Sequence, residues 1–260
     1  MKKIITGFHP IEEILRAEKM RREKNEKKTA YFEILYFKIG PRVKKILEIA
    51  EDLKITVRLE EKQTLDECTK HLPEQLKDHR GIVLILESDE EDKKISIEEF
   101  CAKLFQKEKA FVAILDSITD PHNIGSIVRS ADQFAIDGII VPENKSAGGG
   151  EIIAKTSAGA SAWIPVVSTA NLVRTAEKLK KDGFWIYGAD AGGTPVSSVN
   201  FPKKVALVMG NEGSGISRLL ENTCDEIISI PVQGKLDSLN VSVAAGILFY
   251  EISRKIECSK

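Results

Sequence analysis

Cysteine and histidine, the residues most often used to bind transition metals, are scarce in this sequence. Each occurs four times in 260 residues. The cysteines are widely scattered, with no CxxC pair and no histidine cluster beside them; they are Cys68, Cys101, Cys224 and Cys258. This spacing argues against structural zinc and indicates no disulfide framework. We therefore expect no metal and a protein of the reducing cytoplasm.

Long hydrophobic runs are also missing. No window approaches the roughly eighteen consecutive apolar residues of a membrane span, so we expect no membrane partner. The N-terminal stretch MKKIITGFHPIEEIL meets charge again at Glu12 and Glu13, and so lacks the apolar core of a signal peptide. With 42% hydrophobic and 30% charged residues, the composition is that of an ordinary globular protein. The length favours two domains.

The chain has almost no net charge, but its charges are unevenly distributed. The formal net charge is −1. Residues 1–58 contain 15 Lys and Arg against 9 Asp and Glu, a net of +6, whereas residues 59–109 contain 9 against 14, a net of −5. A basic segment can supply the phosphate attraction that nucleic-acid binding needs. A solvated lysine-rich helix face would have the same composition, so charge alone leaves the question open.

Residues 1–86 alternate helix-like and strand-like segments, which is typical of a small αβ domain. The expected helices are 9–22, 42–53 and a short one near 64–70, and the expected strands are 30–37, 55–59 and 81–86. The charge run ESDEEDKK at 87–94 holds no apolar residue, and an amphipathic segment follows it. We interpret 87–109 as a linker.

From residue 110 the pattern changes to short apolar runs, each followed by a helical stretch. The runs are AFVAILDSI, DGIIVP, IPVVS, FWIYGAD, VALVMGNE and EIISIP. Such runs are typical of strands buried in a parallel sheet. The alternation predicts a doubly wound α/β domain over 110–260, with its ligand crevice beyond the carboxyl ends of the strands. Functional residues should therefore follow strands.

The first informative loop is LDSITDPHNIGSIVRSAD. Asp120 and Pro121 suit a helix start, as cap and first-turn residue. The apolar stripe expected on the helix is Ile124, Ile127, Val128, Ala131 and Ala135. Arg129 falls off this stripe and lies about 120° round the helix from Asn123. It therefore either points towards a crevice or forms a surface salt bridge.

The second loop is VALVMGNEGSGIS. Gly210, Gly213 and Gly215 follow a strand, so the backbone can turn sharply and approach a ligand. Glu212 lies inside the turn, where its carboxylate would repel a phosphate. The loop therefore suits a cationic ligand or an arginine partner, or is simply a glycine-rich connection.

The third loop leads from the strand EIISIP into a long apolar helix, VSVAAGILFYE. Ser238 and Asn240 precede this helix and could serve as plain N-caps. The helix is apolar nearly all round. It should therefore be buried under the sheet or against a second subunit.

Taken together, NIGSIVRSAD, VMGNEGSGI and IPVQGKLDSLNVSVAA resemble the three ordered motifs of the SpoU family of RNA 2′-O-methyltransferases, in the SPOUT class. They occur in order across residues 110–260. GFHPIEEILR and the basic αβ segment resemble the small substrate-binding domain that many members carry in front. The chain resembles most the bacterial 23S rRNA (guanosine-2′-O-)-methyltransferase subgroup.

The resemblance implies an α/β fold: a C-terminal SPOUT-type parallel-sheet domain with a trefoil knot, plus an N-terminal RNA-binding domain at 1–86. It implies S-adenosyl-L-methionine as cofactor, RNA as substrate and a homodimer. Carried over by position, Gly210, Ile230 and Leu239 are expected to bind the cofactor. The expected catalytic positions are Asn123, Arg129, Glu212, Ser238 and Asn240.

Three other functions compete with this interpretation. A transfer-RNA 2′-O-methyltransferase of the same family would carry the same motifs, and so would a non-catalytic RNA-binding protein that keeps the fold. A NAD-dependent oxidoreductase would need GxGxxG after an early strand and an acidic residue about twenty positions later, and this order is absent. The expected reaction is methylation of a ribose 2′-hydroxyl, and the subgroup that the chain resembles most implies a guanosine of 23S rRNA. Arg129 would hold the neighbouring phosphate, since arginine is a poor base.

Overall fold

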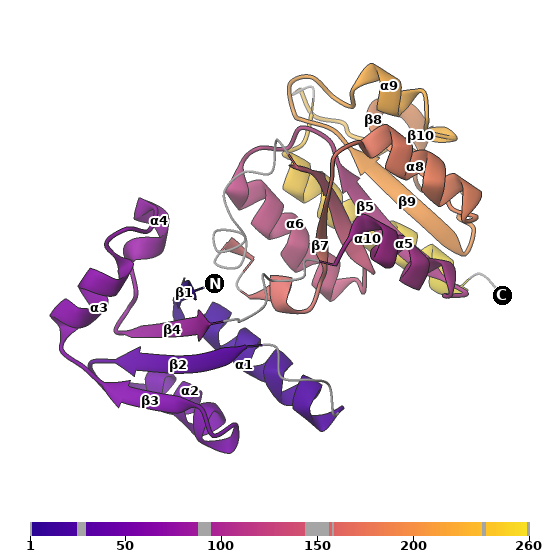
Figure 1. Ribbon diagram of the computed structural model, residues 1–260. Helices are drawn as coiled ribbons and strands as arrows, with labels where there is room; N and C mark the ends of the chain where they lie inside the picture. Colours follow the sequence, from indigo (N-terminus) through magenta and orange to yellow (C-terminus); the bar gives the residue numbers. More distant parts are fainter. Residues whose placement is uncertain are drawn as a thin grey trace. The chain divides into compact units, whose positions relative to one another are not determined.

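The computed structural model describes residues 2–24, 30–87, 95–143, 156–157, 159–235 and 238–258. The chain divides into two compact units (Figure 1). The first contains residues 1–93 and 148–163, and the second contains residues 94–147 and 164–260. Each unit has its own sheet and its own hydrophobic core.

The first unit is built on a four-stranded mixed sheet in the order β1-β4-β2-β3. Its strands are β1 (Lys2–Thr6), β2 (Tyr31–Tyr36), β3 (Thr56–Leu59) and β4 (Ile82–Glu87). Strand β4 runs antiparallel to β1 and β2, whereas β2 and β3 are parallel. The three expected strands are confirmed. Strand β1 was not foreseen, because its sequence KKIIT is too short to show an alternating pattern.

Helices cover both faces of this sheet. They are α1 (Phe8–Glu23), α2 (Pro41–Asp52), α3 (Lys62–Thr69) and the short α4 (Glu74–Lys77). Ile11 of α1 and Ile46 of α2 share a buried cluster with Leu84 of β4. Leu65 of α3 packs with Val83 in a second cluster. Since neighbouring residues of a strand point to opposite faces, α1 and α2 lie on one face and α3 on the other.

A stretch from much later in the chain also packs on α1. It contains the 3-10 helix η2 (Ala160–Ala162). A Cβ added at Gly159 would lie 2.7 Å from Cβ of Glu13, so a larger residue does not fit there. The indole Nε1 of Trp163 donates a hydrogen bond to Oε2 of Glu13 over 2.9 Å. The helical stretch that the sequence predicts between the runs DGIIVP and IPVVS, EIIAKTSAGA, lies mostly outside the described residues.

The second unit is built on a six-stranded parallel sheet in the order β10-β8-β9-β5-β6-β7. Its strands are β5 (Ala110–Leu115), β6 (Gly138–Pro142), β7 (Val166–Thr169), β8 (Trp185–Pro195), β9 (Lys204–Met209) and β10 (Glu226–Ser229). All six expected apolar runs therefore form strands. The predicted parallel α/β sheet is confirmed.

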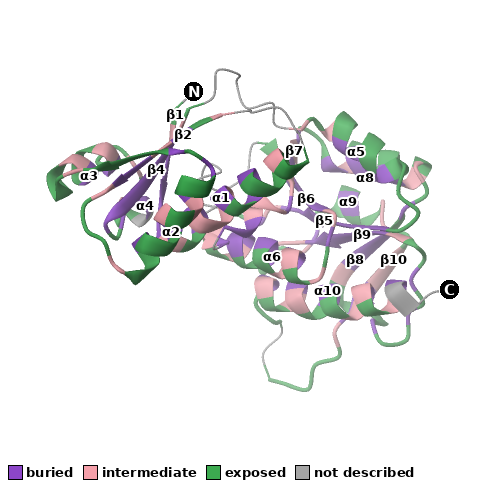
Figure 2. Cartoon of the chain, turned by 90° about the horizontal axis from the view of Figure 1, so that it is seen from below, coloured by how far each residue is buried: buried purple, intermediate pink, exposed green. Residues whose placement is uncertain are grey.

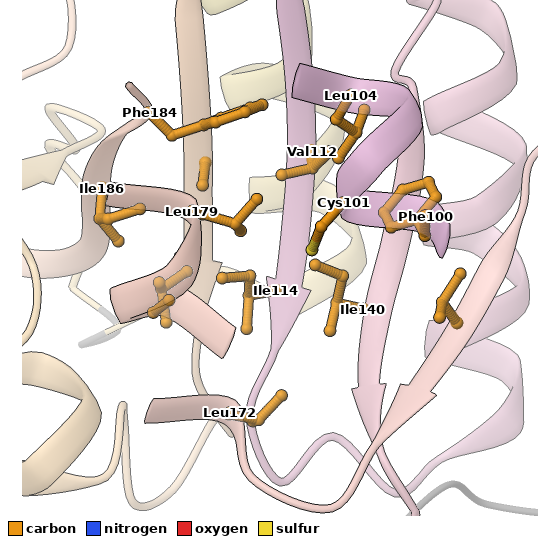
Figure 3. Close-up of a cluster of buried hydrophobic side chains, with 14 of the residues drawn as sticks. Phe100, Cys101, Leu104, Val112, Ile114, Ile140, Leu172, Leu179, Phe184 and Ile186 are labelled. Carbon is orange, nitrogen blue, oxygen red and sulfur yellow. The ribbon is translucent and has the colours of Figure 1, made fainter. Parts of the chain in front are cut away.

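Helices pack on both faces of the parallel sheet, as Figure 2 shows. They are α5 (Ile97–Phe105), α6 (Pro121–Gln133), α8 (Leu172–Lys181), α9 (Arg218–Glu221) and α10 (Val241–Cys258). Phe100 and Cys101 of α5 meet Val112 of β5 and Leu179 of α8 in one buried cluster (Figure 3). On the opposite face the ring of Phe111 in β5 contacts Phe249 of α10 edge-on, with ring centroids 5.7 Å apart.

Helix α5 falls inside the stretch interpreted as a linker. It is nevertheless a well-made helix. The Ser96 hydroxyl accepts a hydrogen bond from the Glu99 backbone N–H, and the Glu99 carboxylate accepts one from the Ser96 N–H. Such a capping box satisfies two backbone donors at a helix start. With its apolar face in the core of the second unit, α5 is part of that unit.

The order of the strands determines where a ligand crevice can form. From β5 the chain builds outward through β6 and β7, and it then returns to place β9 on the other side of β5. In parallel sheets, ligands bind beyond the carboxyl ends of the strands where the order reverses. That point lies between β5, which ends at Leu115, and β9, which ends at Met209.

The trefoil knot that the resemblance implies stays a prediction. Within the ranges described, no helix is both long enough and apolar enough to cross a membrane.

Candidate active site

Three of the expected catalytic residues form one hydrogen-bonded cluster beside the switch between β5 and β9. The Asn240 amide Nδ2 donates to Oε1 of Glu212 over 2.7 Å and to Oδ1 of Asn123 over 3.1 Å. The Asn123 amide Nδ2 lies 3.5 Å from the same Glu212 oxygen. Each residue comes from a different sequence motif, and the fold brings all three together.

Asn123 is positioned by the start of α6. The Asp120 carboxylate accepts a hydrogen bond from the His122 backbone N–H over 2.9 Å, which caps the helix, and Pro121 occupies the first turn. A cap of this kind stabilises a helix by about 1 kcal/mol. The first four residues of the expected apolar stripe are buried. Ala135 is a correction: the helix ends at Gln133, and Ala135 is exposed with φ of 52°.

Glu212 is held in a loop that is braced from several sides. Asn211 and Gly215 exchange two backbone hydrogen bonds across it. The Asn211 side chain accepts from the Gly213 N–H and donates to the Ser117 carbonyl after β5. A Cβ added at Gly210 would lie 2.1 Å from the Gly215 carbonyl carbon. Glycine is therefore required at 210 by the close approach of two backbone segments.

Asp116 is a buried carboxylate that sequence reasoning missed. Its Oδ2 accepts from the Ser217 backbone N–H over 2.8 Å, and its Oδ1 accepts from the Ser117 hydroxyl over 3.0 Å. Asp116 thereby connects the end of β5 to the far end of the loop that contains Gly210, Gly213 and Gly215, which we call the glycine loop. The available signal was a charged residue directly after an apolar strand. A carboxylate at such a position is buried only where hydrogen-bond donors satisfy its oxygens.

Asn240 serves both as a helix cap and as a member of the cluster. Its Oδ1 accepts from the Ser242 backbone N–H over 3.0 Å at the start of α10, while its Nδ2 is used in the cluster. Glu212 Oε1 also accepts from the Val241 backbone N–H over 3.0 Å. A carboxylate at a helix N-terminus is favoured by the helix dipole. The capping and site interpretations of Asn240 are therefore compatible.

Arg129 and Ser238 do not join this cluster. Arg129 is exposed on α6, away from the buried stripe, and its side chain makes no ion pair with any residue in the described ranges. The alternative interpretation, in which Arg129 forms a surface salt bridge, therefore finds no carboxylate partner in the described ranges. Ser238 is also exposed, two residues before the cap at Asn240. Both side chains are therefore available to a ligand.

The residues expected at the cofactor all lie at the same edge of the sheet. Gly210 directly follows β9, Ile230 directly follows β10, and Leu239 directly precedes Asn240. Gly210 presents bare backbone, Ile230 is half-buried and Leu239 is exposed. This set offers neutral backbone groups and apolar surface. It suits a ligand that combines an aromatic base with hydrogen-bonding groups.

No charged metal site accompanies these residues. In the part of the chain that the structure describes, no three His, Cys, Asp or Glu side chains come together as metal ligands would. Within β8, burial raises the pKa of the Tyr187 hydroxyl to about 12, and after α9 it raises the pKa of the Cys224 thiol to about 11. Both groups are therefore protonated at neutral pH and do not supply a nucleophile.

Comparison with known proteins now identifies the family. A model described as the SpoU rRNA methylase family matches residues 110–250. The chain belongs to this family. A second model, described as RNA 2′-O ribose methyltransferase substrate binding, matches residues 4–92.

Individual SpoU relatives support this assignment. The chain is 38% identical over 228 residues to a Borreliella burgdorferi protein named an uncharacterized tRNA/rRNA methyltransferase, covering 85% of this chain and 97% of the relative. It is 35% identical over 254 residues to a TrmH family tRNA/rRNA methyltransferase of Staphylococcus aureus, covering 97% and 91%.

Solved structures share the fold. The SpoU methyltransferase AviRb from Streptomyces viridochromogenes, in complex with the cofactor AdoMet, has a TM-score of 0.73 at 22% identity and covers 100% of this chain and 92% of its own. The A. aeolicus TrmH/SpoU tRNA modifying enzyme has a TM-score of 0.52 at 30% identity, covering 62% of this chain and 84% of its own.

These findings confirm several predictions. The chain is an RNA methyltransferase of the SpoU family with a parallel α/β sheet and a substrate-binding domain in front. S-adenosylmethionine is the cofactor of this family's enzymes, as the AdoMet complex illustrates. The roles of the individual site residues, the domain boundaries at 86 and 109, the homodimer and the identity of the RNA stay predictions.

Proposed function

We propose that this protein methylates the ribose 2′-hydroxyl of a guanosine in 23S rRNA, using S-adenosylmethionine. The observation that carries the proposal is the hydrogen-bonded cluster of Asn123, Glu212 and Asn240 at the switch between β5 and β9. Side chains from three motifs, 89 and 28 residues apart along the chain, meet at the Glu212 carboxylate, in a chain of the SpoU family.

Gly210, Ile230 and Leu239 would hold the cofactor. The absence of a side chain at Gly210 and the apolar character of Ile230 and Leu239 fit an adenosine-containing ligand. When bound, the cofactor supplies a methyl group on a positively charged sulfur.

The cluster and Arg129 divide the remaining work on the RNA. Glu212 Oε1 is already surrounded by donors, so it fixes the relative positions of Asn123 and Asn240. Arg129 holds the phosphate next to the target ribose, since its planar fork matches phosphate oxygens. A 2′-hydroxyl is a weak nucleophile, so holding the nucleotide in place is a large part of catalysis.

The first unit would select the RNA. Residues 4–92 match the substrate-binding model, and residues 1–58 carry a net of +6, 15 basic against 9 acidic residues. We place the boundaries of this RNA-binding domain at 1–86 and of the methyltransferase domain at 110–260, with the joining segment 87–109 contributing α5 to the core of the second unit. The scattered cysteines favour action in a reducing cytoplasm.

A homodimer would complete the enzyme. Helix α10 presents an exposed apolar stripe at helical spacing, formed by Val243, Ile247 and Tyr250. An exposed apolar stripe of this kind is typical of a subunit interface. In a two-fold dimer the same stripe would meet itself.

Mapping of 2′-O-methyl groups tests the proposal and separates its alternatives. The purified protein, radiolabelled S-adenosylmethionine and either 23S rRNA or total transfer RNA from a strain lacking the gene would be incubated, and the modified nucleotide located. Label in one guanosine of 23S rRNA is the expected result. Label in transfer RNA alone would favour the tRNA enzyme. Cofactor binding with no transfer to either RNA would contradict both.

A further inference from the structure

One edge of the first unit's sheet carries apolar side chains that the core does not use. Phe37, Ile39 and Leu59 are 36%, 59% and 67% exposed, and we call them the apolar edge. Strands β2 and β3 are parallel and end together, with Tyr36 paired to Leu59. All three side chains therefore lie at or just beyond the carboxyl ends of these two strands.

Phe37 is fixed in place although it is exposed. Its backbone N–H donates to the Gly81 carbonyl over 3.2 Å. Its ring lies against Gly81, where an added Cβ would come within 2.9 Å of the ring atom Cε1. Gly81 has φ of +89°, which favours glycine. The ring is therefore held at the surface against the backbone of Gly81, where the absence of a side chain leaves room for it.

Beside the ring lies a shallow hollow of about 540 Å³, lined by Phe37, Leu59, Glu60, Glu61 and Lys62. It has an aromatic ring and an aliphatic side chain for its walls. Its two carboxylates can accept hydrogen bonds from amino groups. This is the chemistry that suits a single nucleic-acid base, which has an apolar face and a polar rim.

Lys62 lines the hollow beside Glu60 and Glu61, and Lys38 directly follows Phe37 in the chain. Lys38 and Lys62 are exposed and pair with no carboxylate in the described part of the chain. Arg42 lies over the Phe8 ring, 5.7 Å from its centroid, at the adjoining start of α1 and α2. Elsewhere on this unit many cations are neutralised, as Arg16 is by Glu12 and Glu13.

We propose that the apolar edge binds an unpaired nucleotide of the RNA substrate. The base lies in the hollow against Phe37 and Leu59, and Lys38 and Lys62 hold the neighbouring phosphates. Sequence-specific RNA recognition mostly uses unpaired bases stacked on aromatic side chains, because the grooves of an RNA duplex hide the base edges. This inference rests on the proposed function, since it assigns to RNA a surface of the substrate-binding unit.

Strand β2 offers a matched control for Phe37. Tyr31 stands at the opposite end of the same strand, is 45% exposed, and donates its hydroxyl to Thr56 Oγ1 over 2.9 Å. Full-length Phe37→Ala, Phe37→Tyr and Tyr31→Ala proteins would be compared by fluorescence anisotropy. The probes are a labelled 23S rRNA hairpin with a single-stranded loop, and a blunt RNA duplex of equal length.

Phe37→Ala should weaken hairpin binding roughly tenfold, in line with the loss of one stacked base. Phe37→Tyr and Tyr31→Ala should bind like the wild type, and duplex binding should not change. Leu59→Ser provides a second variant at a highly exposed position, where folding is not at risk. Equal hairpin affinity for Phe37→Ala, Leu59→Ser and wild type would overturn the proposal and favour a protein partner for this edge.

Salt dependence tests the cations separately. Lys38→Gln and Lys62→Gln should each lower the slope of log affinity against log salt by about one. Unchanged slopes in both would contradict phosphate contact. The proposed reaction can fail independently of the binding surface. If the protein binds the hairpin through Phe37 but methylates no RNA, the binding surface stands and the proposed function is wrong. If it methylates RNA but Phe37→Ala binds the hairpin like the wild type, the proposed function stands and the binding surface is wrong.

Discussion

Glu212 lies at the centre of the hydrogen-bonded cluster, and we propose that it is a positioning residue. One of its oxygens lies within hydrogen-bond distance of the Asn240 amide, the Val241 backbone N–H and the Asn123 amide. We propose that it joins the three loops, so that the two asparagines would meet the RNA in one fixed arrangement.

Arg129 is the residue on which the mechanism can be tested most directly. Because it is exposed and off the buried stripe of α6, Arg129→Ala should change the free energy of unfolding by less than about 0.5 kcal/mol. If it grips a phosphate in the transition state, turnover should fall on the order of a hundredfold, with cofactor affinity unchanged. Single-turnover methylation and calorimetric binding would measure the two effects.

Arg129→Lys is the control for charge. It should rescue turnover poorly, because lysine keeps the positive charge but loses the planar fork. Near-normal turnover in Arg129→Ala would remove this residue from the mechanism.

We expect the cofactor site to depend most on the shape of the glycine loop. Gly210→Ala would place a Cβ 2.1 Å from the Gly215 carbonyl carbon, so the loop must open. Such overpacking usually costs about 1–3 kcal/mol of stability. Cofactor affinity should fall at least tenfold, because Gly210 is expected to contact the cofactor. Titration calorimetry and thermal unfolding would record both losses.

Gly213→Ala is the matched control in the same loop. The nearest atom to its added Cβ is Asn211 Oδ1 at 3.5 Å, an ordinary contact. It should bind cofactor and unfold like the wild type. Equal cofactor affinity in both glycine variants would contradict a role for this loop in binding.

Helix α10 carries the prediction about assembly. Ile247→Asp puts a charge in the middle of its exposed apolar stripe, where a partner helix would have to desolvate it. The wild type should be a dimer at micromolar concentration and the variant a monomer, as measured by light scattering. Leu219→Asp, on the exposed face of α9, introduces the same charge away from the stripe and should stay dimeric. A wild-type protein that is monomeric would disprove the dimer.

At the scale of the whole molecule, the two units should divide their work. Deleting residues 1–86 should abolish methylation yet leave cofactor affinity nearly unchanged, because the expected cofactor residues all lie in the second unit. The deletion uncovers Trp163, which donates to Glu13 of α1, so the truncated protein must first be shown to fold by circular dichroism. Full activity on RNA after truncation would refute the division.

Buried acids in the second unit predict a loss of stability at alkaline pH. Burial raises the pKa of Cys224 from 9.0 to about 11 and that of Tyr187 from 10.0 to about 12. Between these values the folded chain keeps protons that the unfolded chain has lost, so stability falls as pH rises. The stabilisation is complete below pH 9 and is lost by about pH 12.

Cys224→Ala tests the sign of this effect. Removing the thiol should flatten the decline in the free energy of unfolding between about pH 9 and pH 11, measured by urea denaturation. Tyr187→Phe should flatten it between about pH 10 and pH 12. A decline equally steep in both variants and in the wild type would show that other groups cause it.

The sequence by itself determined the elements and the candidate residues of the second unit. Its six apolar runs became six strands because only a sheet covered on both faces buries such runs. Asp120 and Pro121 marked the start of α6 because capping is a local property of a few residues. Ordered motifs then pointed to the family, since each motif keeps its own spacing within one loop.

Tertiary structure alone decided how distant parts of the chain meet. Strand β1 pairs with β4 across eighty residues, and α5 joins a core that its charged surroundings did not suggest. One Glu212 oxygen meets the amides of Asn123 and Asn240 only because β5 and β9 are neighbours in the sheet. Such contacts depend on strand order and on the burial they make possible, and periodicity within a segment carries no information about either.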